Sequence, residues 1–70
     1  MHVGEMVKEV RLRRGLSQEE FAVLLGVTQQ WVSLFEGRRS CTVGTLERVA
    51  DAVGMELRVQ FVEVHLLGRR

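Results

Sequence analysis

The residues best suited to chemistry in this chain are two adjacent glutamines flanked by hydroxyl side chains. Gln29 and Gln30 follow Thr28, and Ser33 comes one helical turn later. A glutamine amide carries a donor and an acceptor, so it can pair with two edge atoms of adenine in the major groove of DNA, and small hydroxyls reach bases or phosphates. The alternative is an ordinary helical hairpin with a polar outer face. The pattern favours DNA-base reading over that alternative.

Capping signals divide the first three-quarters of the chain into four predicted helices. Ser17, Thr28 and Thr42 stand where N-caps are expected, and Ser17 starts a capping box with Glu20. A glycine follows each helix, and Gly15 stands where a left-handed C-cap would. The predicted helices are 4–14 before Gly15, 18–25 before Gly26, 29–36 before Gly37, and 43–53 before Gly54. The fold class is therefore predicted to be mainly α.

The turn between the second and third predicted helices must be tight. Gly26 supplies the positive φ that the turn needs, and Ala22 is small where the two helices approach. Val27 and Val32 would hold the later helix from beneath. The apolar face of the earlier helix is assigned to Phe21, Leu24 and Leu25. This helix-turn-helix geometry would leave one outer face of the later helix exposed, namely Thr28, Gln29, Gln30, Ser33 and Leu34.

The C-terminal segment changes to strand periodicity. Met55, Leu57, Val59 and Phe61 alternate with polar residues, and the parity flips after Phe61, as at a bulge or a strand end. No other segment alternates in this way, and an unpaired edge of this length would aggregate. We therefore expect antiparallel pairing with the same strand of a second copy. The alternative is a frayed tail ordered only by crystal contacts.

Length and composition narrow the class of protein. Seventy residues form one domain that buries roughly 60% of its surface on folding. A single cysteine, Cys41, excludes an internal disulfide and a cysteine-rich zinc site. No apolar run approaches the roughly 20 residues of a membrane span, and no signal peptide is visible at the start. We expect a cytoplasmic protein that does not contact a membrane.

Charge and reactive residues give little support for other functions. The net charge is only +1, and the arginines at segment ends could either form a basic patch or simply complement helix C-termini. His2 and His65 are isolated, and Cys41 is expected as buried filler. No nucleophile elbow, phosphate loop or metal motif is present. We therefore expect no enzyme, no cofactor and no metal.

Residues 3–57 together resemble the Cro/C1-type helix-turn-helix family, also called XRE-like. The resemblance implies a lambda-repressor-like bundle of four to five helices, although this chain has room for four helices and a strand. It divides the chain into a DNA-binding domain over 1–54, a dimerising strand over 55–66 and a tail over 67–70. The residues that carry the resemblance are Val3-Gly4, Val7, Arg11, Gly15-Leu16-Ser17-Gln18, Phe21-Ala22, Leu25-Gly26-Val27-Thr28, Val32-Ser33, Phe35-Glu36-Gly37, Thr45-Leu46, Ala50 and Val53-Gly54.

The resemblance assigns roles to individual residues. Bases would be contacted by Thr28, Gln29, Gln30 and Ser33. Phosphates would be contacted by Gln18 at a helix N-terminus and by Arg38, Arg39 and Ser40. Arg11 and Glu36 match the family's buried ion pair between the first and third helices. Two positions depart from the pattern: Trp31 and Leu34 could pack on sugar or a thymine methyl, or face a protein partner, and Trp31 could also be inert surface.

These features predict a sequence-specific DNA-binding transcriptional regulator, and specifically a homodimeric repressor. The dimer would place two recognition helices about one DNA turn apart on an inverted repeat. The leading alternative is an antitoxin, because HipB-type antitoxins have a similar layout with a dimerising C-terminal strand; such a protein would bind its own operator and a toxin protein. A third reading is a protein-interaction adaptor that uses Trp31, Leu34 and the strand.

Overall fold

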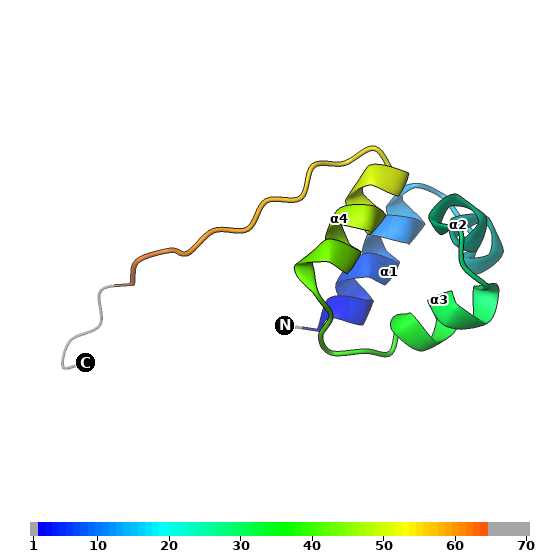
Figure 1. Cartoon of the computed structure of the whole chain (residues 1–70), viewed down its shortest axis with the longest axis horizontal. Helices are drawn as coiled ribbons and strands as arrows, with labels where there is room; N and C mark the ends of the chain where they lie inside the picture. Colours follow the sequence, from blue (N-terminus) through cyan, green and yellow to red (C-terminus); the bar gives the residue numbers. More distant parts are fainter. Residues whose placement is uncertain (1, 65–70) are drawn as a thin grey trace.

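The computed structural model describes residues 2–64 and forms a small helical body with an extended C-terminal segment (Figure 1). The helices are α1 (Val3–Arg13), α2 (Gln18–Leu25), α3 (Gln29–Phe35) and α4 (Val43–Ala52). Each lies within one residue of its predicted bounds, so the mainly helical prediction is confirmed. Part of the prediction lies outside the described residues, namely the last two residues of the predicted strand (65 and 66, which include His65) and the predicted tail over 67–70.

The helices begin at the predicted caps. The Ser17 hydroxyl accepts a hydrogen bond from the Glu20 amide at 3.0 Å, and the Ser17 amide donates to the Glu20 carboxylate at 2.8 Å, which completes the capping box. Thr28 and Thr42 accept in the same way from the amides three residues later. Gly26 ends α2 in the left-handed conformation, with φ of 73°. Local chemistry thus determines where three of the four helices begin.

The core lies where α2 meets the other helices. Phe21 and Val32 are the largest fully buried side chains, and both come from the helix-turn-helix pair. Cys41, expected as buried filler, is half-buried against the core. The other buried apolar residues are Val7, Ala22, Leu25, Phe35, Val49, Ala50 and Val53. None of the helices among residues 2–64 is long and apolar enough to cross a lipid bilayer.

The assignment of Leu24 to the buried face of α2 is wrong. Leu24 is 51% exposed, whereas Phe21, Ala22 and Leu25 are buried. At about 100° per residue, those three positions form a narrow stripe, and Leu24 projects from the helix roughly 100° away from its centre. A short helix that packs with one stripe therefore leaves this leucine at the surface.

The N-terminus of α1 is fastened to the loop that follows α3. The Gly4 amide donates to the Arg38 carbonyl at 2.8 Å, and the Val3 amide donates to the Arg39 carbonyl at 3.4 Å. A Cβ atom on Gly4 would overlap the backbone carbonyl of Glu36. Glycine is needed here because two backbones approach closely, and this contact fixes the course of the loop from α3 to α4.

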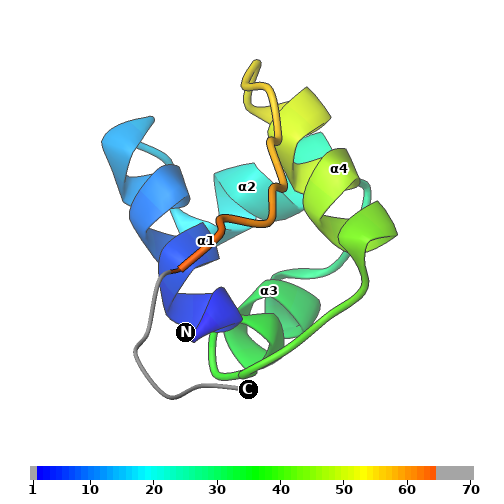
Figure 2. The same ribbon diagram turned by 90° about the vertical axis from the view of Figure 1, so that its left-hand side faces the viewer.

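Residues 55–64 leave the end of α4 and extend away from the helices (Figure 1). From here on, we call residues 55–64 the tail; they fall within the predicted strand and are distinct from the predicted tail over 67–70. Figure 2 shows the face from which it departs, with α1 and α4 on either side. Within residues 2–64 no strand is formed, so the predicted strand is not confirmed. A strand needs a partner backbone, and this single chain offers no second extended segment among its described residues.

Candidate nucleic-acid interface

Helix α3 presents the predicted base-contacting residues on one exposed face. Val32 and Phe35 of α3 are buried, and Val27 in the turn is half-buried beneath the helix. The Val27 amide donates to the Ala22 carbonyl at 3.0 Å, which ties the turn back to α2. The face opposite this anchor is exposed and carries Thr28, Gln29, Gln30 and Ser33. The structure therefore brings these four side chains together where an external ligand can reach them.

Trp31 and Leu34 occupy different environments on α3. The Trp31 ring stacks on Phe35 with centroids 4.9 Å apart and an interplanar angle of 7°, and it is half-buried against the core. Sequence reasoning missed this stack, although the spacing of four residues was its signal. Leu34 is 68% exposed. Trp31, Leu34, Phe35 and Arg38 line a surface hollow of about 250 Å³, so the two departures from the family pattern border one recess.

The predicted phosphate-contacting residues after α3 lie on a fixed loop. Arg38, Arg39 and Ser40 are exposed, while the carbonyls of the two arginines accept hydrogen bonds from the N-terminus of α1. The backbone is therefore held and the cationic side chains are free to reach outward. Such a rigid base suits arginines that must meet a phosphate at a defined position.

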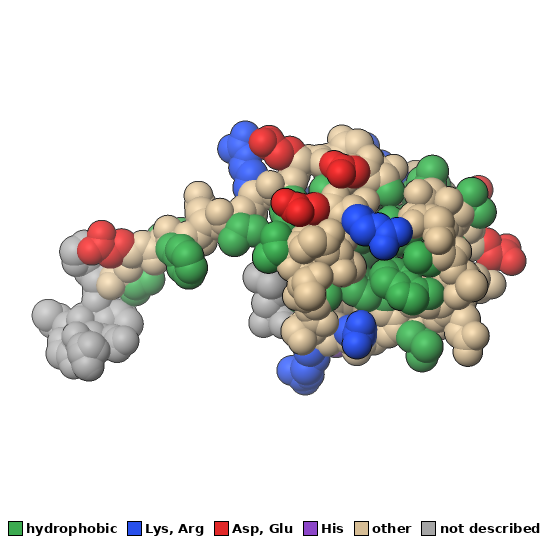
Figure 3. Space-filling view, in the orientation of Figure 1, with side chains coloured by type: hydrophobic (Ala, Val, Ile, Leu, Met, Phe, Trp, Pro, Cys, Tyr) green, Lys and Arg blue, Asp and Glu red, His purple; other side chains and the backbone are tan. Residues whose placement is uncertain are grey.

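Basic side chains gather at one edge of the body. In Figure 3, basic side chains lie along the edge where the loop from α3 to α4 runs, whereas acidic side chains lie over the later part of α4, next to a further basic side chain, and at the α2 end of the body. The net charge of +1 does not reveal this local group of basic side chains. These basic side chains favour an anionic ligand at this edge.

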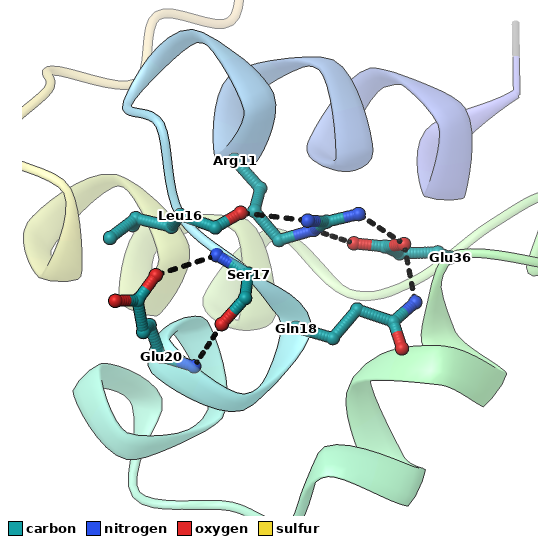
Figure 4. A network of polar contacts seen from close by, with 6 residues as sticks. All are labelled: Arg11, Leu16, Ser17, Gln18, Glu20 and Glu36. Carbon is teal, nitrogen blue, oxygen red and sulfur yellow. Dashed lines mark hydrogen bonds and ion pairs between the residues drawn. The ribbon is translucent and has the colours of Figure 1, made fainter.

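The predicted ion pair between Arg11 and Glu36 is confirmed and buried (Figure 4). Arg11 Nε donates to Glu36 Oε2 at 2.6 Å, and Nη2 donates to Oε1 at 3.2 Å. Arg11 Nη1 also donates to the Leu16 carbonyl at 2.8 Å. One guanidinium thus joins α1, the loop before α2 and the end of α3, and it sets the position of α3 relative to α1.

Gln18 is bound to the same carboxylate. Its Nε2 donates to Glu36 Oε1 at 3.1 Å, and the residue is half-buried (Figure 4). An amide nitrogen carries two protons, so one proton remains for another acceptor. No local pattern predicts this contact, because Gln18 and Glu36 are distant in the chain. Glu36 therefore orients the side chain that was predicted to meet a phosphate.

Arg48 is a second residue that sequence reasoning missed. Its Nη2 donates to the Leu25 carbonyl at 2.8 Å, at the end of α2. The last carbonyls of a helix lack partners within the helix, and a cation there also complements the helix dipole. Arg48 thus fixes α4 against the turn that leads into α3.

Comparisons with known proteins also point to a helix-turn-helix. Residues 2–60 match the family described as a helix-turn-helix domain. The chain is also similar to a protein of Sinorhizobium fredii (strain NBRC 101917 / NGR234) named as the uncharacterized HTH-type transcriptional regulator y4dJ. The two are 43% identical over 54 residues, which cover 76% of this chain and 70% of the relative.

Proposed function

Since this chain belongs to the helix-turn-helix domain family, we propose that it is a sequence-specific DNA-binding transcriptional regulator that acts as a homodimeric repressor. One observation supports this function above the others: α3 is anchored on its apolar side and exposes a polar face that holds Gln29, Gln30 and Ser33. The name of the similar protein, an HTH-type transcriptional regulator, supports the regulator part of this proposal.

The exposed face of α3 would enter the major groove, which is wide enough to admit a helix. Gln29 and Gln30 would each pair with an adenine, and the hydroxyls of Thr28 and Ser33 would reach neighbouring base edges or phosphates. Leu34 exposes methyl groups beside them, and these suit the methyl group of thymine. The half-buried Trp31 would then support the helix and pack on sugar at its edge.

Phosphate contacts on both sides of α3 would fix its register. Gln18 would use the amide proton that Glu36 leaves free, with the N-terminus of α2 supplying further N–H groups. Arg38, Arg39 and Ser40 would bind the backbone from their anchored loop. Such contacts favour all sequences alike, so they would add affinity while the glutamines supply specificity.

Repression would follow from occupation of an operator. A homodimer would read an inverted repeat whose half-sites lie about 10 base pairs apart. A bound dimer on a promoter excludes RNA polymerase from the same stretch of DNA.

Selection of bound sites from a random pool of DNA tests the proposal. We expect enrichment of an inverted repeat with adenines in each half-site. A variant with both Gln29→Ala and Gln30→Ala is the matched control: its circular dichroism should be unchanged, and the enriched adenines should disappear. Failure of the unaltered protein to enrich any sequence would refute the function.

The tail supports a second candidate, the antitoxin of a toxin–antitoxin pair. Val59, Phe61, Val62 and Val64 are exposed apolar side chains that a protein partner could cover. This candidate predicts a neighbouring, cotranscribed reading frame whose product arrests growth. Coexpression with this chain should relieve the arrest, and coexpression with a variant lacking the tail should not.

A further inference from the structure

An apolar groove lies between α1 and α4, on the face from which the tail departs. Its volume is about 150 Å³. Met6 and Val10 of α1 and Leu46 of α4 are half-buried in its wall. The start of the tail, at Met55 and Leu57, also lines it. The groove therefore adjoins the start of the tail, the segment that was predicted to pair with a second copy.

The tail displays the alternation that its sequence predicted, but only its first residues are covered. Met55 and Leu57 are half-buried at the groove, whereas Glu56 and Arg58 are exposed and pair with each other at 3.2 Å. Beyond them, Val59 and Phe61 continue the apolar positions without cover, and Phe61 is fully exposed. The apolar side chains of the tail thus begin at the groove and continue beyond its end.

Phe61 is badly placed to fill the groove of its own chain. Phe61 lies four residues beyond Leu57, which places it about 13 Å farther along the extended tail. Within residues 2–64, the backbone of residues 56–64 makes no hydrogen bond. A tail laid alone on two helices would still lack partners for these groups, whereas two antiparallel tails satisfy one another.

We propose that the groove between α1 and α4 receives Phe61 from the tail of a second copy of this chain. The two tails pair antiparallel, and each delivers its outer apolar side chains to the body of the other copy. This inference rests on the homodimer proposed above and assigns the surface that the partner covers. The groove and the exposed tail are then two halves of one reciprocal contact.

Disulfide trapping between copies tests this assignment. In a Cys41→Ser background, a Met6→Cys variant and a Phe61→Cys variant are mixed in equal amounts and oxidised with diamide. We expect a covalent dimer in which mass spectrometry finds Cys at position 6 linked to Cys at position 61. Because each chain carries one cysteine, this link can form only between copies. Leu46→Cys on α4 provides a second groove position if Met6→Cys perturbs the fold.

The control places the cysteine on the other side of α1. Lys8 is exposed on α1 and does not line the groove. A Lys8→Cys variant mixed with Phe61→Cys should give much less of the mixed dimer. Equal yields from positions 6 and 8 would overturn the assignment, since trapping would then reflect random collision.

Three other outcomes would also overturn it. If a chain carrying both Met6→Cys and Phe61→Cys forms the link within a monomer, its own tail is the occupant of the groove. Links between positions 61 alone would place the tails together but away from the groove. An absence of any link from either groove position would leave the groove without this partner.

Failure here is distinguishable from failure of the proposed function. If site selection still enriches an inverted repeat while no groove link forms, the regulator dimerises through another surface. If the groove link forms but no DNA sequence is enriched, the dimer stands and the DNA-reading function fails.

Discussion

The helical body and the tail both carry a regular pattern of apolar residues, but the body buries these side chains and most of the tail does not. In the body, apolar side chains on four helices find one another, and the main polar groups of the interior have partners within the chain. In the tail, an equally regular apolar pattern remains exposed. Periodicity predicts which face a segment will bury, but only a partner surface decides whether burial takes place.

The two ion pairs of the described residues make this contrast measurable. Arg11–Glu36 is buried in the body, while Arg58–Glu56 is largely exposed in the tail. Removal of one partner of a buried pair leaves an uncompensated charge, so Glu36→Ala should lower the free energy of unfolding by about 3–5 kcal/mol. Glu56→Ala should change it by no more than about 0.5 kcal/mol, because water screens an exposed pair.

Urea unfolding followed by circular dichroism measures both variants. The denaturant dependence should stay the same, so that the midpoint alone reports the change in stability. Similar losses for Glu36→Ala and Glu56→Ala would mean that the tail belongs to the same cooperative unit as the body.

Two glycines test how tightly the body is packed. Gly4→Ala inserts a methyl group into the Glu36 carbonyl and should cost about 1–3 kcal/mol, with displacement of the loop that carries Arg38. Gly44→Ala, in the first turn of α4, meets only the Thr42 hydroxyl at 3.8 Å. Alanine favours helix over glycine, so this control should gain about 0.5–1 kcal/mol. Thermal unfolding of the two variants should move in opposite directions.

Within the body, base reading and phosphate binding should respond differently to mutation. Gln30→Ala should cost about 1–3 kcal/mol of discrimination at one base pair of the selected site. Arg39→Ala should weaken binding to every sequence and flatten the salt dependence by about one unit. Titrations of cognate and scrambled DNA at several salt concentrations separate the two. A Gln30→Ala variant that weakens both DNAs equally would remove Gln30 from the reading face.

Local signals were enough to predict most of the body. The capping box at Ser17, the N-caps at Thr28 and Thr42, and the left-handed Gly26 act within a few residues of themselves, so their sequence context specifies them. The ion pair of Arg11 and Glu36 was implied by family resemblance, which carries long-range information that spacing lacks. The exposure of Gln29 and Gln30 followed from the turn geometry.

The features that were missed depend on contacts between distant residues. Leu24 is apolar and lies at helical spacing, but its exposure follows from the direction in which α2 meets the rest of the body. The bond from Gln18 to Glu36 and the bond from Arg48 to Leu25 exist only once three helices are assembled. The tail needs information from beyond one chain, so its pattern could indicate a strand without supplying the partner.

Val59→Asp tests the tail with the smallest expected effect on the body. Val59 is 67% exposed, so at concentrations where the chain is monomeric the change in unfolding free energy should stay within about 0.5 kcal/mol. The unaltered protein should sediment as a dimer, and its melting temperature should rise with concentration, because association stabilises the folded state by mass action. Val59→Asp should sediment as a monomer and lose that dependence. Val23→Asp, at a more exposed valine of α2, is the matched control and should remain dimeric. A Val59→Asp variant that sediments as a dimer would place the dimer contact on the body and show that the tail does not contribute to it.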